Sequence, residues 1–148
     1  MSKAGFSGGC LCGAVNYEVS GEARMSVHCH CTDCRKSSGT GHGTHIGLSE
    51  DQLSITGTLK FYDRAADSGN IVSRGFCPEC GSAVYSTNSA MPGMVFVRAS
   101  SLDDPEAISP IMSVYASRAI SWDPIAPDLP SFPEMPSAMP EGAGAGQG

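Results

Sequence analysis

The seven cysteines of this chain fall into three short clusters, and this arrangement constrains the fold more than any other feature of the sequence. The clusters are Cys10-Leu-Cys12, Cys29-His-Cys31-Thr-Asp-Cys34 and Cys77-Pro-Glu-Cys80. Four thiolates close a tetrahedral structural zinc site, whereas three leave one position of the ion for water or substrate. The clusters therefore predict two zinc ions per chain, with different roles.

The spacing within each cluster suits a metal ion. Residues i and i+2 of an extended chain share a face, so Cys10 and Cys12 can reach the same ion. In the C-x-x-C pair, Pro78 favours a tight turn and Gly81 permits a positive φ after the second ligand.

The way the clusters combine follows from counting ligands. Cys29, Cys31 and Cys34 lie within one short segment and can bind one ion by themselves. The two remaining pairs then complete a four-cysteine site that joins the N-terminal strand to a much later loop. A single zinc with idle, buried thiols is the alternative. A disulfide framework is disfavoured by the odd number of cysteines and by the lack of a secretion signal.

The three-cysteine site is the candidate for chemistry, and histidines lie near it in the sequence. A histidine as fourth ligand would make this site structural as well. In an extended segment His30 would face away from its neighbouring cysteines, whereas His42 and His45 could fold back across the glycines. Roles as surface or turn residues are equally open for the four histidines: His28, His30, His42 and His45.

An open, thiolate-rich zinc site suits a thiol substrate, because soft sulfur binds zinc as the thiolate. Arg35 and Lys36 directly follow the three-cysteine cluster and could pair with a substrate carboxylate. Ser38 and Gly39 lie in a small, flexible loop that would let a ligand approach the backbone. Solvated helix surface and ordinary turn chemistry are the alternatives for these four residues.

Composition and periodicity predict a mostly β fold with one or two short helices. The chain has 148 residues with 18 glycines and 10 prolines, which favours short strands and turns. Alternating apolar residues indicate strands, with a hairpin around Gly57 between Leu53–Ile55 and Leu59–Phe61. The other strands are expected at Val15–Val19, Ala83–Tyr85, Val95–Val97 and Met112–Ala116, with turns at glycines 69, 75, 81 and 93.

A short helix is predicted over Thr32–Ser38. Thr32 or Asp33 can cap its start, and Gly39 can end it.

The C-terminal part of the chain is rich in proline, with one at every third position from 124 to 136. The apolar residues between them predict that Trp122–Phe132 packs back on the domain as an irregular arm. A disordered tail and a ligand for a proline-recognising domain are the alternatives. We therefore expect one zinc-binding domain over residues 1–133 and a Pro/Gly-rich tail over 134–148, with 141–148 disordered.

The net charge of −6 disfavours binding to nucleic acid or an anionic membrane. No helix follows a C-x-x-C hairpin in finger spacing, which disfavours a nucleic-acid-binding zinc finger. The first residues contain no apolar run, and no segment is apolar enough to span a bilayer. The expected location is therefore the cytoplasm.

Three segments together resemble the glutathione-dependent formaldehyde-activating enzyme family and the related centromere-protein-V-like proteins. They are residues 9–17, 29–39 and 76–82, and the resemblance runs from about residue 6 to about residue 133 through Trp122–Ile125 and Asp128–Phe132. It implies a β-tent fold of small antiparallel sheets pinned by zinc. It also implies a structural zinc on Cys10, Cys12, Cys77 and Cys80, and a second, active-site zinc on Cys29, Cys31 and Cys34.

The activity that this resemblance implies is carbon–sulfur lyase chemistry, in which formaldehyde and glutathione combine reversibly to S-hydroxymethylglutathione. The expected partner is a small thiol such as glutathione or a related adduct, and a homodimer is left open. The alternative from another class is a non-catalytic zinc-binding module that binds a thiol metabolite or a protein partner.

Overall fold

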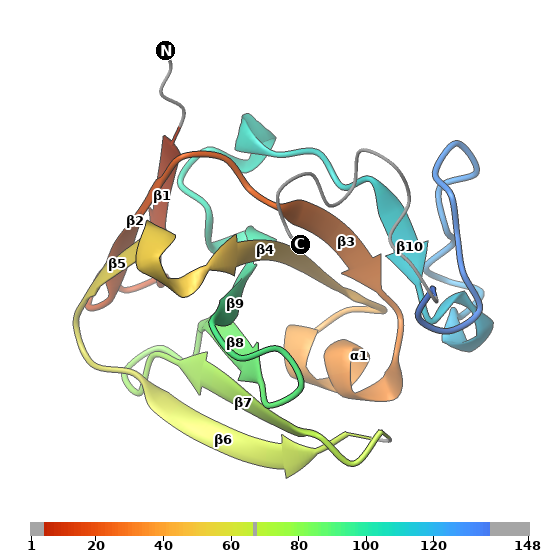
Figure 1. The fold of residues 1–148 in the computed structure, drawn as a ribbon, viewed down its shortest axis with the longest axis horizontal. Coiled ribbons are helices and arrows are strands. Elements are labelled where there is room, and N and C mark those ends of the chain that lie inside the picture. The colour runs from red at the N-terminus through yellow and green to blue at the C-terminus, as the bar shows by residue number, and fades with distance from the viewer. Residues whose placement is uncertain (1–4, 67, 137–148) are drawn as a thin grey trace.

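Two β-sheets form the framework of the molecule (Figure 1). The computed structural model describes residues 5–66 and 68–136. The smaller sheet is antiparallel and has the order β1-β2-β5, with β1 Gly5–Gly9, β2 Asn16–Ser20 and β5 Leu53–Thr56.

The larger sheet has seven strands in the order β10-β3-β4-β9-β8-β7-β6. It is mixed, because β10 runs parallel to β3 while the other pairs are antiparallel. The strands are β3 Met25–Cys29, β4 Gly43–Ser49, β6 Lys60–Ala65, β7 Ile71–Phe76, β8 Ala83–Asn88, β9 Met94–Arg98 and β10 Met112–Val114.

The helical elements are short. One α-helix is described, α1 at Thr32–Ser38, between β3 and β4. The 3-10 helices are η1 Glu50–Gln52, η2 Ala99–Ser101, η3 Pro105–Ala107 and η4 Ala116–Arg118. The prediction of a mostly β fold with one or two short helices is therefore confirmed, and no described helix has the length and apolar character needed to cross a bilayer.

The main core lies where the two sheets meet, and it follows from strand alternation. Val15, Tyr17 and Val19 are buried as predicted, while Asn16 and Glu18 are exposed. These side chains pack against Ile46 and other buried residues of the larger sheet. The Tyr17 hydroxyl forms a 2.6 Å hydrogen bond with Ser101 Oγ, and burial raises the pKa of Tyr17 to about 12.

The predicted hairpin around Gly57 is wrong. β5 pairs with β2 in the smaller sheet, whereas β6 pairs with β7 in the larger one. Gly57 has φ +105° and lies so close to the Ala14 carbonyl that a Cβ would overlap it. The glycine therefore lets the chain cross from one sheet to the other instead of turning back on itself.

Two smaller predictions also need correction. Gly75 lies inside β7 next to a β-bulge rather than in a turn, and the Phe61 ring covers the space where its Cβ would be. Gly69, Gly81 and Gly93 have positive φ, as expected of turns. The N-cap of α1 is Cys31, not Thr32 or Asp33, while Gly39 ends the helix with φ +83° as predicted.

The proline-rich arm packs back on the larger sheet. Ser113 of β10 donates its amide to the Pro130 carbonyl, and Phe132 donates to the Ser113 carbonyl, each at 2.9 Å. The Phe132 side chain packs against buried side chains of β3 and β10, whereas Trp122 is 67% exposed. The prediction for 141–148, and most of the expected tail at 134–148, lies outside the described residues.

Ile46 tests this account of the core. It is fully buried on the interior strand β4, so we expect Ile46→Ala to lower the free energy of unfolding by about 2–5 kcal/mol. Ile71→Ala is the matched control, because Ile71 is 43% exposed and should lose less than about 1 kcal/mol. Urea denaturation at fixed zinc content measures both, and equal losses would contradict this assignment of the core.

Candidate functional site

Cys10, Cys12, Cys77 and Cys80 come together where the two sheets meet. Their sulfur atoms all lie within 4.8 Å of one another. Cys10 and Cys12 follow β1 in the smaller sheet, whereas Cys77 and Cys80 form the turn between β7 and β8 in the larger sheet. The structure therefore brings together the four residues for which the sequence predicts a common site.

The spacing of these sulfur atoms fits a tetrahedral ion. The distance between Sγ atoms is 3.7 Å for Cys10 and Cys12, and 3.8 Å for Cys12 and Cys77. A zinc–sulfur tetrahedron with bonds of about 2.3 Å has edges of about 3.8 Å. The donor set and its spacing are thus compatible with a closed, four-thiolate zinc site.

Backbone amides and a hydroxyl group donate hydrogen bonds to the sulfur atoms of this cluster and stabilise their ionised form. The Val15 amide donates to Cys10 Sγ at 3.2 Å, and the Glu79 amide donates to Cys77 Sγ at 3.3 Å. Hydrogen bonds from the Ser82 hydroxyl and amide lower the pKa of the Cys80 thiol to about 5. The turns therefore hold the sulfurs in place and also help them to bind a cation.

Cys29, Cys31 and Cys34 form a second cluster at the junction of β3 and α1. Their sulfur atoms also lie within 4.8 Å of one another. Cys29 ends β3, Cys31 is the N-cap of α1, and Cys34 lies in its first turn. The Cys34 amide donates to Cys31 Sγ at 3.3 Å, so the sulfur itself caps the helix.

The three thiols of this second cluster differ in their pKa values. Hydrogen bonds from the Cys29 and Cys34 thiols lower the pKa of Cys31 to about 2. The same contacts raise the pKa of Cys29, which is buried beside the Cys31 sulfur. Without a cation, the crowded site therefore favours one thiolate, and a bound cation would be needed to ionise all three.

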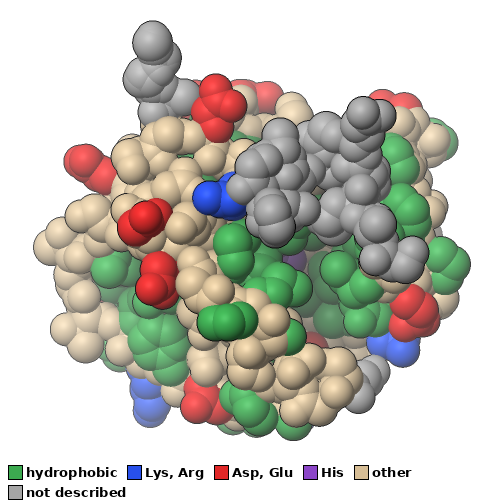
Figure 2. Space-filling view, in the orientation of Figure 1, with side chains coloured by type: hydrophobic (Ala, Val, Ile, Leu, Met, Phe, Trp, Pro, Cys, Tyr) green, Lys and Arg blue, Asp and Glu red, His purple; other side chains and the backbone are tan. Residues whose placement is uncertain are grey.

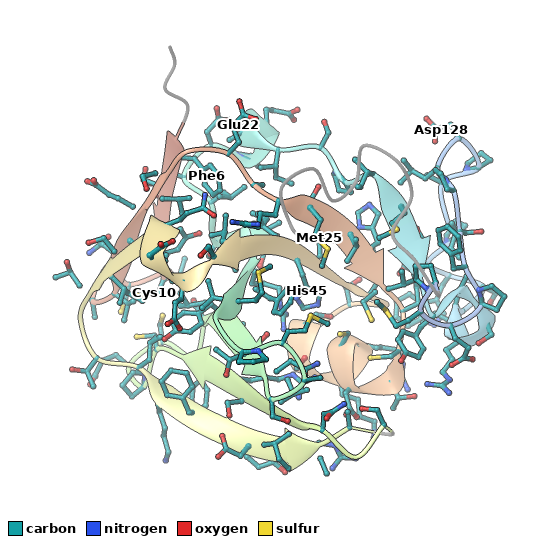
Figure 3. All side chains as sticks on the ribbon, viewed as in Figure 1. Phe6, Cys10, Glu22, Met25, His45 and Asp128 are labelled. Carbon is teal, nitrogen blue, oxygen red and sulfur yellow. The ribbon has the colours of Figure 1, made fainter. Side chains whose placement is uncertain are left out.

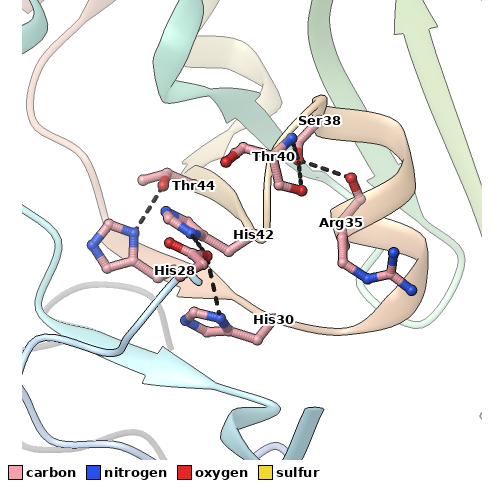
Figure 4. Close-up of polar contacts among 8 residues, drawn as sticks. His28, His30, Arg35, Ser38, Thr40, His42 and Thr44 are labelled. Carbon is pink, nitrogen blue, oxygen red and sulfur yellow. Dashed lines mark hydrogen bonds and ion pairs between the residues drawn. The ribbon is translucent and has the colours of Figure 1, made fainter. Parts of the chain in front are cut away.

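Three of the histidines, His28, His30 and His42, lie close together (Figure 4), whereas His45 lies at the three-cysteine cluster. His45 Nε2 lies 3.3 Å from Cys34 Sγ, and burial lowers the pKa of His45 to about 3, so its ring is neutral. His30 is close to His42 and Asp123, which agrees with the expectation that it faces away from Cys29 and Cys31. Of the four histidines, His45 is thus the one that contacts the three-cysteine cluster.

A cleft of about 590 Å³ opens beside the three-cysteine cluster. Figure 2 shows hydrophobic side chains around a hollow on this face of the molecule. Met25 and His45, which are labelled near the middle of the same view in Figure 3, both line the cleft. Apolar side chains line the cleft, among them Met25, Val72, Phe96 and Met112. Cationic side chains also line the cleft, namely Arg64, Arg74 and Arg118.

The sequence-based candidates for substrate contacts lie elsewhere. Arg35, Ser38 and Gly39 do not line this cleft, and Ser38 Oγ instead donates to the Arg35 carbonyl at 3.0 Å. Lys36 lines a smaller neighbouring pocket of about 350 Å³. No pattern in the sequence indicates Arg64 or Arg74 as site residues, since only the pairing of β6 with β7 places them together.

The fold and the two cysteine clusters define a small, mostly β protein with two candidate zinc centres. The family model described as glutathione-dependent formaldehyde-activating enzyme matches residues 5–118. The chain belongs to this family.

One curated relative comes from Halomonas elongata and is named, provisionally, as a glutathione-dependent formaldehyde-activating enzyme. It is 34% identical over 107 residues, which cover 65% of this chain and 64% of the relative. A solved structure of a Rhodobacter sphaeroides protein is similar with a TM-score of 0.54 and 22% identity, covering 70% of this chain and 91% of that one. This second similarity concerns the fold alone.

The two clusters should differ in their effect on stability. A metal bound by Cys12 and Cys77 closes a loop of 65 residues, whereas the second cluster closes only a short segment. Loop-closure entropy then favours the first site by about 2 kcal/mol. We expect Cys77→Ala to lose one thiolate-bound zinc and to unfold at clearly lower urea concentration than Cys34→Ala.

Zinc released by a thiol-blocking mercurial measures the thiolate-bound ions, and urea denaturation measures the stability. Each variant should release one ion fewer than the wild-type chain. An equal loss of stability in the two variants would contradict the different structural roles of the clusters.

Proposed function

We propose that this chain is a zinc-dependent carbon–sulfur lyase acting on a small thiol–aldehyde adduct. The reaction that the family name supports is the reversible combination of glutathione with formaldehyde to S-hydroxymethylglutathione. The expected zinc ions are two per chain, one on Cys10, Cys12, Cys77 and Cys80 and one on Cys29, Cys31 and Cys34.

The observation that carries this proposal is the position of the three-cysteine cluster on the cleft. Cys29, Cys31 and Cys34 all contribute to its lining. Its volume of about 590 Å³ lies within the range of about 300–1,000 Å³ typical of small-molecule sites. A zinc ion with these three protein ligands would keep a position for a substrate sulfur or oxygen.

Arg74 is the best-placed residue for a substrate carboxylate. It is half-buried on β7, and it makes no hydrogen bond or ion pair with any residue that the structure describes. Arg64 is already bound to Asp33, with 3.2 Å between Arg64 Nε and Asp33 Oδ2. Glutathione carries two carboxylates, so a cation without a carboxylate partner in the cleft would orient its thiol toward the cysteines.

His45 is a positioning residue in this scheme. Its ring is neutral, and Nε2 contacts Cys34 Sγ. When Cys34 is ionised, Nε2–H must donate to the sulfur, which fixes the tautomer and leaves Nδ1 as an acceptor. His45 therefore holds the Cys34 sulfur in place on the floor of the cleft.

The rate of adduct formation tests the role of the cluster. Glutathione and formaldehyde also combine without a catalyst. Exchange NMR measures the rate of this exchange, and the uncatalysed rate is subtracted as the background. We expect Cys34→Ala to remove this excess rate while the far-UV circular dichroism spectrum stays that of the wild type. If the variant keeps the wild-type rate, the active site lies elsewhere.

Arg74→Gln tests the substrate contact. Loss of a charged hydrogen bond of about 1.5–3 kcal/mol should raise the KM for glutathione about 10-fold or more, with a smaller effect on kcat. Arg35→Gln is the matched control, because Arg35 lies outside the cleft lining, and its KM should not change. The reverse result would move the carboxylate contact from β7 to α1.

The same measurements separate catalysis from simple binding. A non-catalytic zinc module would bind glutathione, with affinity reduced by Arg74→Gln, and yet add nothing to the background rate. That outcome would overturn the proposed activity while leaving the assignment of the cleft intact.

A further inference from the structure

A second polar centre lies apart from the cysteine cleft, between the ends of β3 and β4 and the C-terminal arm. His30 follows β3, His42 precedes β4, and Asp123 belongs to the arm. The ring nitrogens of the two histidines and a carboxylate oxygen of Asp123 lie within 4.8 Å of one another. Figure 4 shows the His30 and His42 rings near each other, and their centroids are 5.0 Å apart.

Asp123 lies closer to His42 than to His30. His42 Nδ1 lies 2.5 Å from Asp123 Oδ2, whereas His30 Nδ1 lies 3.9 Å from the same oxygen. The first distance is a short hydrogen bond, and the second is too long for one. The two nitrogens therefore point at one carboxylate that satisfies only one of them.

The unsatisfied nitrogen of His30 is deeply buried. The His30 side chain is 2% exposed, and its Nδ1 has no hydrogen-bond partner in the described parts of the chain. Leaving a buried polar atom without a partner is costly, and such atoms are rare in native structures. An uncompensated nitrogen that points at a carboxylate and a second imidazole is therefore a sign of a missing ligand.

The backbone is also shaped around the carboxylate. A Cβ at Gly41 would overlap the Asp123 side chain, approaching its Cγ to 2.7 Å. On the far side, His28 packs edge-on against His42, with ring centroids 4.8 Å apart, and His28 Nδ1 is held by Thr44 Oγ1 at 2.8 Å. The position of the His42 ring is thus fixed by neighbours that would not bind the ion themselves.

We propose that His30, His42 and Asp123 form a third metal site, which takes a divalent transition-metal ion such as Zn²⁺ or Co²⁺. Two imidazoles and one carboxylate are a donor set for such ions. Metal bonds of about 2.0–2.2 Å place neighbouring ligand atoms roughly 3.0–3.5 Å apart. The observed distances of 2.5 and 3.9 Å lie on either side of that value, so a small shift of the carboxylate toward His30 would satisfy both nitrogens.

The site would attach the arm to the domain, independently of the function proposed for the cleft. Asp123 lies 81 residues beyond His42 in the chain, and it belongs to a segment that otherwise docks through Pro130 and Phe132. An ion at this point stabilises the docked arm in proportion to its occupancy. The ion therefore has a structural effect that can be measured without any assay of catalysis.

Cobalt binding to the full chain loaded with two equivalents of zinc, enough to fill the thiolate sites only, tests the third site. With the thiolate sites filled by zinc, Co²⁺ added as the chloride should bind with a stoichiometry of one by calorimetry, without an intense sulfur-to-cobalt charge-transfer band. It should shift the ring signals of His30 and His42 by NMR more strongly than those of His45. It should also slow proteolysis within the arm.

Two variants and one control make the test specific. Asp123→Asn and His42→Gln should each weaken Co²⁺ binding at least about 10-fold, because each removes a ligand. Asp128→Asn makes the same chemical change at an exposed position of the arm and should bind Co²⁺ as the wild type does. The proposal is wrong if the wild type binds no ion beyond its thiolate sites, or if Asp123→Asn binds one equally well.

Discussion

The two sheets of this protein are joined at the cluster of four cysteine sulfur atoms. Cys10 and Cys12 come from the smaller sheet, while Cys77 and Cys80 come from the larger one. Cys77 is fully buried, and it belongs to the same packed cluster as Val15 and Ile46. The apolar contacts between the sheets and the sulfur cluster therefore support each other, since a bound ion would also limit how far the sheets can separate.

The second cysteine cluster depends on that framework in a different way. Its three residues are close in sequence, yet the cleft beside them is built from strands of the larger sheet that lie far along the chain. Arg74 reaches the cleft from β7, which continues directly into the four-cysteine turn at Cys77. The four-cysteine turn and the cleft are therefore connected through one strand of the larger sheet.

Local spacing in the sequence was enough to predict what is local in the structure. The helix over Thr32–Ser38, its end at Gly39 and the three-cysteine cluster depend on neighbours within a few residues, whereas the joining of the other two cysteine pairs followed from counting ligands. Alternation of apolar and polar residues identifies which side chains share a face of a strand. It does not identify the neighbouring strand with which that strand pairs. The segments on either side of Gly57 therefore looked like a hairpin although they belong to different sheets. For the same reason, the neighbourhood of Arg74 and the contact of Asp123 with His42 had no signal in the sequence.

The short segment that begins at Cys29 directs its side chains to both faces of the larger sheet. Successive side chains of an extended strand point in opposite directions, so the cysteines at 29 and 31 face the cleft while His30 faces the arm. Cys31 also caps α1 through its sulfur, so the start of the helix depends on the same atom as the candidate zinc site. The cysteines and His30 are therefore positioned by one backbone segment, and the ions proposed for the two sites would lie on opposite sides of it.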